Sequence, residues 1–456
     1  MNHVAIIGGG PGGYEAALVA AQLGAIVTVI ERDGLGGSTV LTDCVPSKTL
    51  IATADLLDDV SGAEQLGIRT SGDISADLGA VNERVIKLAL AQSADIARRL
   101  ERDKIRVVAG IARLDGPDKV AIQGNDGSTE SLPADVILIA TGAHPRVVDS
   151  ALPDGERILT WEQVYGLGEL PEHLIVVGSG VTGAEFAGAY KALGARVTLV
   201  SSRDRVLPGE DADAANVLED VFTRGGMEVM GTSRMESVCR DGDTVTVTLT
   251  DGRSVTGSHC LLALGSVPNT ADLGLETAGV DLGDGGFIAV DRVSRTTRRG
   301  IYAAGDCTGV LMLASVAAMQ GRIAMSHALG DAVRPLVLGE VVSNVFTAPE
   351  IATVGVTQKM VDQGTIDAES LMLGLAGNPR AKMQGVRDGF VKLFARPGTG
   401  VIVGGVVVGP RASELIHGVS LAVSASLTVD QVAHAFTVYP SMSGSVAEVA
   451  RRMHKR

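Results

Sequence analysis

Cysteine is scarce in this chain, and the few cysteines are far apart. The 456 residues include Cys44, Cys239, Cys260 and Cys307, which form no CxxC pair and no spacing typical of a metal site. Such wide spacing argues against a secreted disulfide framework, so all four residues are expected to be thiols. No metal site is predicted.

Long apolar runs and dense basic runs are missing as well. No uninterrupted apolar stretch approaches the ~20 residues that a membrane-spanning helix needs, and MNHVAIIGGG lacks a basic region followed by a long apolar one. The 53 Asp and Glu residues outnumber the 39 Lys and Arg residues, and the net charge of −14 argues against nucleic acid or an anionic membrane as a general partner. We therefore expect a soluble cytoplasmic protein that neither binds nucleic acid nor inserts into a membrane.

The chain does contain a long internal repeat. A strand from Val4 to Ile7, the loop GGGPGG, a helix and the strand VTVIE follow one another, and residues 174–201 repeat that order. Because unrelated turns do not share a register, the repeat predicts two Rossmann-type units. The offset is 170 positions for Gly8 and Gly178, Gly13 and Gly183, Glu15 and Glu185, and Gly24 and Gly194.

The glycines of each loop have separate physical tasks. Gly8 makes the tight turn, Gly10 lets the backbone approach a pyrophosphate, and Gly13 allows close packing of the helix on the strand. The positive end of the helix then faces the phosphates. The candidate dinucleotide contacts are Gly8, Gly10, Pro11 and Gly13 in the first loop, and Gly178, Gly180, Val181 and Gly183 in the second.

The two units differ at the end of their second strand. Glu31 closes the first repeat, where a carboxylate can accept hydrogen bonds from a ribose 2′-hydroxyl. The equivalent position of the second repeat is Ser201, followed by Ser202, Arg203 and Arg205, so the acid that would repel a 2′-phosphate is missing. Hydroxyl and guanidinium groups suit that phosphate, and NADPH is therefore expected to be accepted alongside NADH. The alternative is that these arginines are solvated surface residues.

The remaining segments complete the two units and add a third domain. VILIATGAHP (136–145) and CLLALGSVPN (260–269) are apolar strands that end near glycine, residues 81–101 have helical apolar spacing, and residues 242–264 have the alternation of hairpin strands. The pattern changes near Pro335, after which the chain has both strand-like and helical segments. We predict an α/β protein with two Rossmann-type dinucleotide-binding domains and a C-terminal α+β domain.

Seven motifs along the chain carry a family resemblance: GGGPGGYEAA, GGSTVLTDCVPSK, ATGAHP, GSGVTGAEFA, LGSVPNT, GIYAAGDC and FTAPEIATVG. With them the sequence resembles the class I pyridine nucleotide-disulfide oxidoreductases, especially the dihydrolipoamide dehydrogenase-like members. The resemblance implies FAD on the first unit, NADH or NADPH on the second, and a C-terminal dimerisation domain that forms a homodimer and lends residues to the partner's site. The implied boundaries are 1–148 and 273–335 for the FAD-binding domain, 149–272 for the NAD(P)-binding domain and 336–456 for the dimerisation domain.

The resemblance also assigns individual site residues. Lys48 would pair with Glu185 beside flavin N5, where a lysine stabilises the anionic reduced flavin and a glutamate keeps that lysine fixed and charged. Cap or surface charges are the alternative for this pair. Asp306 would hold the ribityl chain of FAD. The other implied contacts are Gly37, Ser38, Gly110, Thr141, Gly142, Met312, Leu313, Ala314 and Ser315 for FAD, and Val238 and Gly265 for the nicotinamide nucleotide.

Three departures from the disulfide-reducing members concern their thiol relay. Those members have a second cysteine five residues before the one in CVPSK, where this chain has Thr39. They also have a histidine followed five residues later by a glutamate, where this chain has Tyr439 and Gly444. Thiol–disulfide exchange requires an attacking thiolate and a base that manages its proton, and Thr39 supplies neither.

The joint loss of thiol, base and acid indicates a different reaction. Electrons that reach FAD are expected to leave directly from the flavin to a quinone or a similar conjugated oxidant. The branch of the family with this same loss acts as NAD(P)H:quinone reductase, which is the predicted function. Two alternatives stay open, namely a peroxide or disulfide reductase that uses Cys44 alone, and a non-catalytic flavin-binding subunit.

Two residues at this predicted site have open roles. Cys44 either packs against the flavin or tunes it electronically. Tyr439, donated by the other subunit, either hydrogen-bonds to or stacks on a quinone, or it fills the space of the missing imidazole.

Overall fold

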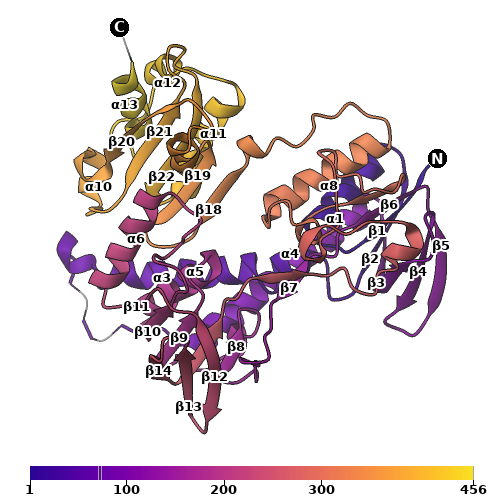
Figure 1. Cartoon of the computed structure of the whole chain (residues 1–456), viewed down its shortest axis with the longest axis horizontal. Coiled ribbons are helices and arrows are strands. Elements are labelled where there is room, and N and C mark those ends of the chain that lie inside the picture. The colour runs from indigo at the N-terminus through magenta and orange to yellow at the C-terminus, as the bar shows by residue number, and fades with distance from the viewer. Residues whose placement is uncertain (70, 73, 455–456) are drawn as a thin grey trace. The chain divides into compact units, whose positions relative to one another are not determined.

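The computed structural model describes residues 1–69, 71–72 and 74–454. The chain divides into two compact units, and each is described by itself. Unit 1 consists of Met1–Thr49, Asn82–Arg146 and Gly265–Val337, and unit 2 consists of Leu50–Val81, Val147–Leu264 and Leu338–Arg456. Figure 1 labels most of the helices and strands. Two helices, α3 (Cys44–Ser61) and α4 (Leu78–Arg102), have residues in both units, and α4 confirms the helix expected over 81–101.

Unit 1 is built on a seven-stranded sheet with the order β17-β6-β1-β2-β3-β4-β5. Pairing is parallel from β17 to β3 and antiparallel from β3 to β5. The central strands are continuously apolar because both of their faces are covered. The strands are β1 (His3–Ile7), β2 (Ile26–Glu31), β3 (Arg106–Leu114), β4 (Lys119–Gly124), β5 (Thr129–Pro133), β6 (Val136–Ile139) and β17 (Ile301–Ala303).

Two helices, α1 (Pro11–Gln22) and α8 (Ala314–Ala328), pack against each other on this sheet (Figure 1). A Cβ atom on Gly321 of α8 would lie 2.1 Å from the carbonyl oxygen of Gly12 in α1, so the close crossing depends on the small residues there. The short elements of unit 1 are α2 (Gly37–Leu41), α7 (Leu275–Ala278) and the antiparallel pair β7 (Ala143–Pro145) and β16 (Ser266–Pro268).

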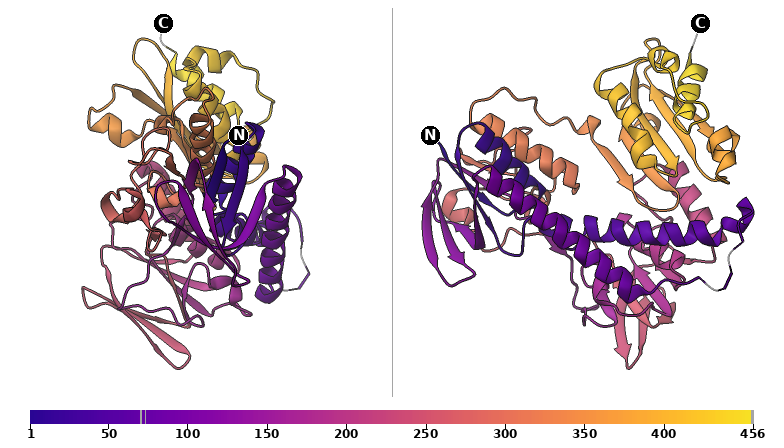
Figure 2. Two further views of the ribbon diagram at one scale, coloured as in Figure 1. Left: turned by 90° about the vertical axis from the view of Figure 1, so that its right-hand side faces the viewer. Right: turned by 180° about the vertical axis from the view of Figure 1, so that it is seen from behind.

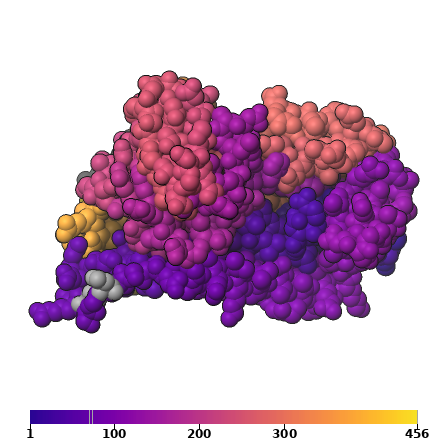
Figure 3. Space-filling model, turned by 90° about the horizontal axis from the view of Figure 1, so that it is seen from below, coloured from indigo at the N-terminus to yellow at the C-terminus, as the bar shows by residue number. Residues whose placement is uncertain are grey.

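The part of unit 2 predicted to bind a nucleotide, called the nucleotide-binding part below, has a five-stranded parallel sheet with the order β11-β10-β9-β15-β8. Beside it lies a three-stranded antiparallel sheet, β12-β13-β14, whose residues form the pink lobe in Figure 3. The elements are β8 (Ile158–Thr160), β9 (His173–Val177), α5 (Val181–Ala192), β10 (Arg196–Val200), α6 (Ala212–Arg224), β11 (Glu228–Met230), β12 (Met235–Asp241), β13 (Thr244–Leu249), β14 (Ser254–Gly257) and β15 (His259–Leu262).

The hairpin expected over residues 242–264 extends only to Gly257, and the rest of that prediction was wrong. Residues 259–262 form β15, which pairs in parallel with β9 and β8 in the central sheet. Cys260, Leu261 and Leu262 are all buried, so this short run has the continuous apolar character of a strand covered on both faces rather than the alternation of a hairpin strand.

The C-terminal part of unit 2 has a five-stranded antiparallel sheet with the order β18-β19-β22-β21-β20. Residues of α11 and α13 share one apolar core with this sheet, shown in orange and yellow in Figure 2. The elements are β18 (Val342–Val345), β19 (Glu350–Gly355), α9 (Gln358–Asp362), β20 (Glu369–Gly374), α10 (Pro379–Met383), β21 (Phe390–Ala395), β22 (Ile402–Gly409), α11 (Ala412–Ser424), α12 (Val429–His434) and α13 (Gly444–Met453).

These elements confirm the predicted fold class, with two Rossmann-type units and a C-terminal α+β domain. The predicted domain boundaries stay predictions. In the part of the chain that the structure describes, no helix has both the length and the apolar character to cross a membrane. The same residues contain no cluster of three or more His, Cys, Asp or Glu side chains suited to a metal ion.

A buried histidine lies at the start of β9. His173 is 8% exposed, and its Nε2 lies 2.8 Å from Oγ1 of Thr198 on β10. The Thr198 hydroxyl donates in turn to Glu228 on β11. Burial, and next the positive charge of Arg196, lowers the pKa of His173 below its usual value. The folded protein therefore favours the neutral imidazole.

We predict that His173→Gln makes folding stability less sensitive to acid. The unfolded chain binds a proton at His173 near pH 6.5, whereas the folded chain resists it, so wild type loses stability as pH falls below about 6.5. Glutamine keeps an N–H donor for Thr198 but does not titrate. Urea unfolding between pH 5 and 8 measures the free energy of unfolding of both proteins. As pH falls, the value for the variant minus the value for wild type should increase, by no more than ~1.4 kcal/mol per pH unit. A difference that is the same at every pH would contradict the prediction.

Candidate functional site

The first glycine loop joins β1 to α1 in unit 1, and two of its glycines are required by neighbouring backbone. A Cβ atom on Gly8, which has a φ of +104°, would lie 2.2 Å from the carbonyl oxygen of Ala140. A Cβ atom on Gly13 would lie 1.9 Å from the carbonyl oxygen of Gly8. The helix therefore starts directly against the end of the strand, which is the geometry of a dinucleotide-binding loop.

The second loop repeats this geometry between β9 and α5 in unit 2. A Cβ atom on Gly178 would lie 2.2 Å from the carbonyl oxygen of Ala263, and one on Gly183 would lie 1.8 Å from the carbonyl oxygen of Gly178. The constant sequence offset thus corresponds to the same steric arrangement in both units.

The middle glycine of each loop has open space in front of it. Gly10 and Gly180 are the N-cap residues of α1 and α5, which begin with Pro11 and Val181. A Cβ atom on Gly10 would have Gly36 O nearest, at 4.0 Å, and one on Gly180 would meet no described atom within 4 Å. Such space before a helix N-terminus suits a pyrophosphate. The two loops therefore fit FAD and a nicotinamide dinucleotide.

Glu31, at the end of β2, is tied to the first glycine loop. Its Oε2 accepts a hydrogen bond from Gly9 N at 2.6 Å, and its Oε1 accepts from Asp33 N and Gly34 N at 2.8 and 3.3 Å. Each carboxylate oxygen has two lone pairs, so the group can also accept from a ribose hydroxyl. The contact of Glu31 with a ribose hydroxyl stays a prediction.

Ser201, the corresponding residue of the second unit, is fully buried. Its Oγ lies 2.7 Å from Oγ of Ser179, accepts from Arg203 N at 3.1 Å, and lies within hydrogen-bond distance of the carbonyl oxygens of Arg203 and Arg205. Ser202 and Arg203 are exposed. The Ser201 hydroxyl thus forms hydrogen bonds within the turn, whereas the side chains of Ser202 and Arg203 are open to solvent.

The segment that contains Thr39 and Cys44 forms the short helix α2 and the beginning of the longer helix α3. Thr39 is half-buried in α2, the helical structure is interrupted at residues 42–43, and α3 begins at Cys44. Gly37 and Ser38 are the first two residues of α2. Lys48 lies one turn further along α3, with its Nζ 3.3 Å from Oγ of Ser47.

The other flavin candidates of unit 1 surround the start of α8. Asp306 follows Gly305, whose N–H donates to the side chain of Gln320 on α8. Burial, and next the carboxylate of Asp43, raises the pKa of Asp306 to about 6. Sequence reasoning did not single out Asp43, because its proximity to Asp306 depends on the tertiary fold. Met312, Leu313, Ala314 and Ser315 lie at the N-terminal end of α8.

The remaining candidates lie at three other places. Thr141 and Asn269 exchange hydrogen bonds of 2.7 and 2.9 Å beside the β7–β16 pair, which Gly142 and Gly265 flank. Gly110 lies on β3, where a Cβ atom would be 2.4 Å from Gln123 O, so strand pairing already requires glycine there. Val238 is buried on β12, and its N–H donates to Ser150 O in unit 2.

Glu185 lies on α5 of unit 2 and is 3% exposed. Its Oε1 accepts a hydrogen bond from the backbone N–H of Phe346, at 2.8 Å, in the turn between β18 and β19. The sequence does not indicate this contact because a backbone donor has no residue signature. Lys48 belongs to unit 1, so the pairing of Lys48 with Glu185 stays a prediction.

Tyr439 lies in the segment between α12 and α13, and its side chain is 83% exposed. Phe436 and Val438 in the same segment are also exposed. Gly444 is the first residue of α13, and His434 ends α12 with its Nδ1 2.7 Å from Asp430 O. The donation of Tyr439 to a partner subunit stays a prediction.

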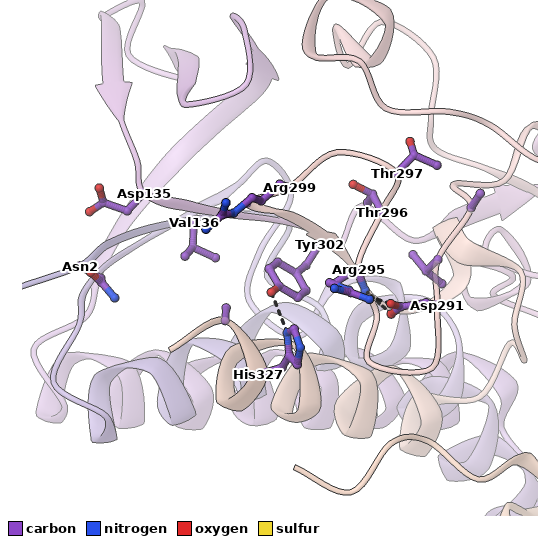
Figure 4. Close-up of a pocket in the computed structure, with 14 residues that line it drawn as sticks. Asn2, Asp135, Val136, Asp291, Arg295, Thr296, Thr297, Arg299, Tyr302 and His327 are labelled. Carbon is purple, nitrogen blue, oxygen red and sulfur yellow. Dashed lines mark hydrogen bonds and ion pairs between the residues drawn. The ribbon is translucent and has the colours of Figure 1, made fainter. Parts of the chain in front are cut away.

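A pocket of about 950 Å³ lies at a different edge of the unit 1 sheet. The pocket is lined by residues just before β1, β6 and β17 and by the end of α8. Figure 4 shows the hydrogen bond between Tyr302 and His327 in this pocket. The glycine loop lies at the carboxyl ends of the strands, where parallel sheets bind dinucleotides. The pocket is therefore separate from the candidate cofactor site.

Comparisons with known proteins identify the family. The family model described as "Pyridine nucleotide-disulphide oxidoreductase" matches residues 2–321, and the model of the family's dimerisation domain matches residues 341–450. A curated relative from Mycobacterium tuberculosis (strain ATCC 25618 / H37Rv), "NAD(P)H dehydrogenase (quinone)", is 54% identical over 99% of this chain and 94% of its own length. A "Dihydrolipoyl dehydrogenase" of Bacillus subtilis (strain 168) is 34% identical over 98% of this chain and 97% of its own length.

Solved structures agree with these relatives. The crystal structure of LpdA from Mycobacterium tuberculosis matches with a TM-score of 0.96 and 54% identity, and the match covers 100% of both chains. The flavoprotein disulfide reductase RclA from Escherichia coli matches with a TM-score of 0.87 at 24% identity, over 99% of this chain and 100% of the other, which supports the fold alone.

We predict different defects for Ala substitutions at two glycines of the second loop. Gly183→Ala forces a Cβ atom against backbone and should destabilise the nucleotide-binding part by ~2 kcal/mol or more. Gly180→Ala places its Cβ in open space, so stability should change by less than ~0.5 kcal/mol while NADP⁺ affinity falls about tenfold or more, through obstruction of the pyrophosphate. Thermal unfolding and NADP⁺ titration separate the two effects. Wild-type NADP⁺ affinity in Gly180→Ala would contradict the assignment.

Proposed function

Since this chain belongs to the class I pyridine nucleotide-disulfide oxidoreductase family, we propose that it is an FAD-dependent NAD(P)H dehydrogenase that reduces a quinone-type acceptor without a redox disulfide. The mycobacterial relative named NAD(P)H dehydrogenase (quinone) supports this acceptor class. The observation that carries the proposal is the replacement of the exchange cysteine by Thr39 on α2, together with Tyr439 and Gly444 in the C-terminal motif.

The residues of unit 1 are suited to hold FAD, which when bound accepts hydride from NAD(P)H and passes electrons to an acceptor. The open space before Gly10 supports binding of the pyrophosphate, and Glu31 is proposed to accept a hydrogen bond from a ribose hydroxyl. Asp306 is proposed to accept from the ribityl hydroxyls. Lys48 is proposed to supply the positive charge near N5, with Glu185 as its partner.

The residues of unit 2 are suited to hold the nicotinamide nucleotide. Gly178, Gly180 and Gly183 repeat the pyrophosphate loop. We assign contact with a 2′-phosphate to Ser202 and Arg203, because Ser201 uses its hydroxyl within the turn. NADPH is thus a proposed donor, alongside NADH.

The sequence leaves two alternative functions open. A peroxide or disulfide reductase would use Cys44, and a non-catalytic flavin-binding subunit would show no turnover. The other three cysteines lie in different elements: Cys239 is exposed on β12, Cys260 is buried in β15, and Cys307 is buried beside Asp306. Burial raises the pKa of Cys307 to about 11, which suits an inert thiol. A reaction through sulfur is assigned to Cys44, because it is the cysteine of the CVPSK motif.

The dimerisation domain and the exposed segment around Tyr439 support a homodimer. In the proposed dimer Tyr439 reaches the acceptor site of the partner subunit, where the phenol hydrogen-bonds to or stacks on the quinone, or fills space. A cytoplasmic location stays a prediction.

We predict that Cys44→Ser retains quinone reduction within about tenfold of wild type, which is ~1.4 kcal/mol of barrier. Neither protein should reduce lipoamide. Anaerobic titration with NADPH should bleach the flavin directly, without the long-wavelength thiolate-to-flavin band of a dithiol enzyme. Steady-state assays with a quinone panel and lipoamide, combined with these spectra, test the proposal. Loss of quinone turnover in Cys44→Ser with FAD retained, or disulfide reduction by wild type at comparable rates, would favour the thiol alternative.

We also predict that Arg203→Ala raises the KM for NADPH about tenfold and leaves the KM for NADH nearly unchanged, because only NADPH carries the 2′-phosphate. Arg196→Ala is the matched control, since Arg196 is an exposed arginine at the opposite end of β10. Steady-state kinetics with both dinucleotides measure the ratio. Equal effects of the two substitutions on NADPH would assign Arg203 to the solvated surface.

A further inference from the structure

The loop of residues 201–211, which connects β10 to α6, is held along its length. Leu207 N donates to the carbonyl oxygen of Ser179 at 2.8 Å, next to the glycine loop. Val206 N donates to Oε2 of Glu219, on α6, at 3.0 Å. The exposed Ser202 and Arg203 therefore project from a backbone whose position is set by internal contacts.

Asp211 fixes the end of this loop. Its Oδ1 caps α6 by accepting from Asp213 N and Ala214 N at 3.0 and 3.3 Å. Its Oδ2 accepts from the ammonium group of Lys392 at 3.0 Å. Lys392 lies on β21 in the sheet of the dimerisation domain, so a domain without a dinucleotide loop of its own holds one end of the 201–211 loop.

The contact is a cluster of three charges, of which Lys392 and Asp211 are buried and Asp213 is half-exposed. The side chains of Lys392 and Asp211 are 4% and 3% exposed, and Asp213 Oδ2, from a side chain 49% exposed, lies 2.8 Å from the same ammonium group. Burial acts to lower the pKa of Lys392, but the hydrogen bonds to Asp213 and Asp211 outweigh it and hold the pKa above its usual value. A buried charge that loses its partner is costly, so the three groups keep a fixed arrangement.

A second ion pair joins the same two regions at the other end of α6. Arg224 lies 2.6 Å from Asp388, with side chains that are 61% and 36% exposed. Exposed pairs of this kind contribute little to stability. Arg224 ends α6, whereas Lys392 meets the start of α6, where the 201–211 loop ends. Substitutions in the two ion pairs can therefore distinguish an effect on the general contact between the domains from an effect on the 201–211 loop.

We propose that Lys392 is a positioning residue for dinucleotide selection, which holds the 201–211 loop so that Ser202 and Arg203 meet the 2′-phosphate. This inference rests on the proposed role of that loop in NADPH binding. Because coupling between two contacts is reciprocal, a ligand on the loop also strengthens the contact between Lys392 and the start of α6.

The test measures binding of 2′,5′-ADP to the FAD-loaded protein by calorimetry, which reports the phosphate site without any turnover. Lys392→Met should weaken binding at least about fivefold, while 5′-AMP, which lacks the 2′-phosphate, changes by less than about twofold. Asp388→Asn, the control for docking, should bind 2′,5′-ADP within about twofold of wild type. Lys392→Arg should restore part of the lost affinity.

Asp213→Asn separates positioning from a simple change of charge, and it serves if Lys392→Met does not fold. Loss of the Lys392 charge makes the cluster more negative, whereas loss of the Asp213 charge makes it less negative. A field effect alone would therefore weaken 2′,5′-ADP binding in the first variant and strengthen it in the second. Positioning predicts weaker binding in both variants.

Each outcome decides one question. If Arg203→Ala does not weaken 2′,5′-ADP binding, the proposed phosphate site itself is wrong. If Arg203→Ala weakens it but Lys392→Met and Asp213→Asn do not, the site stands and the positioning role is overturned. Stronger binding in Asp213→Asn, or equal weakening in Asp388→Asn, would also overturn that role.

Discussion

The constraint on which the structure depends is the contact of each glycine loop with its own backbone. In both units the last glycine lies so close to the carbonyl oxygen of the first that a Cβ atom would sit within 1.9 Å of it. This contact lets a helix begin directly at the end of a buried parallel strand, so that its N–H groups face outward to one point. The middle glycine then leaves that point open. Cofactor binding in this fold is thus a consequence of packing that excludes side chains.

The two loops are sterically equivalent, so the difference between the sites lies in the residues at the ends of β2 and β10. Glu31 turns back onto the first loop and presents a carboxylate there. Ser201 turns inward and makes the next residues project outward. A buried hydroxyl can satisfy several backbone groups at once, as Ser201 does, whereas a carboxylate at the same place would need donors and would repel a phosphate. The residue at this position therefore determines both the hydrogen bonds that hold the turn and whether a negative charge is present there.

The sequence predicted features that depend on local spacing. The repeat, the glycine loops, the helix over α4 and the C-terminal α+β domain follow from periodicity and from residues close in the chain. Features that depend on distant partners were not predictable in this way. Residues 259–262 pair with β9, a strand distant in the sequence, in a sheet that is covered on both faces. Glu185 accepts a hydrogen bond from the backbone N–H of Phe346, and Lys392 forms an ion pair with Asp211, which is 181 positions away in the sequence. The burial of Ser201 could not be predicted from the sequence either, because serine occurs both at the surface and in the interior of proteins.

The loss of the thiol relay changes what the protein must control. A dithiol enzyme carries electrons from the flavin to a separate substrate site, whereas direct transfer requires donor, flavin and acceptor to approach each other without a carrier. Such transfer depends steeply on placement, since reacting atoms must come within ~3–3.5 Å. The dimerisation domain contacts the nucleotide-binding part through buried polar bonds at Glu185 and at Asp211, and buried bonds of this kind are costly to break. These contacts join the end of the 201–211 loop and helix α5 to the dimerisation domain, so the placement of the second glycine loop depends on residues far from it in the sequence.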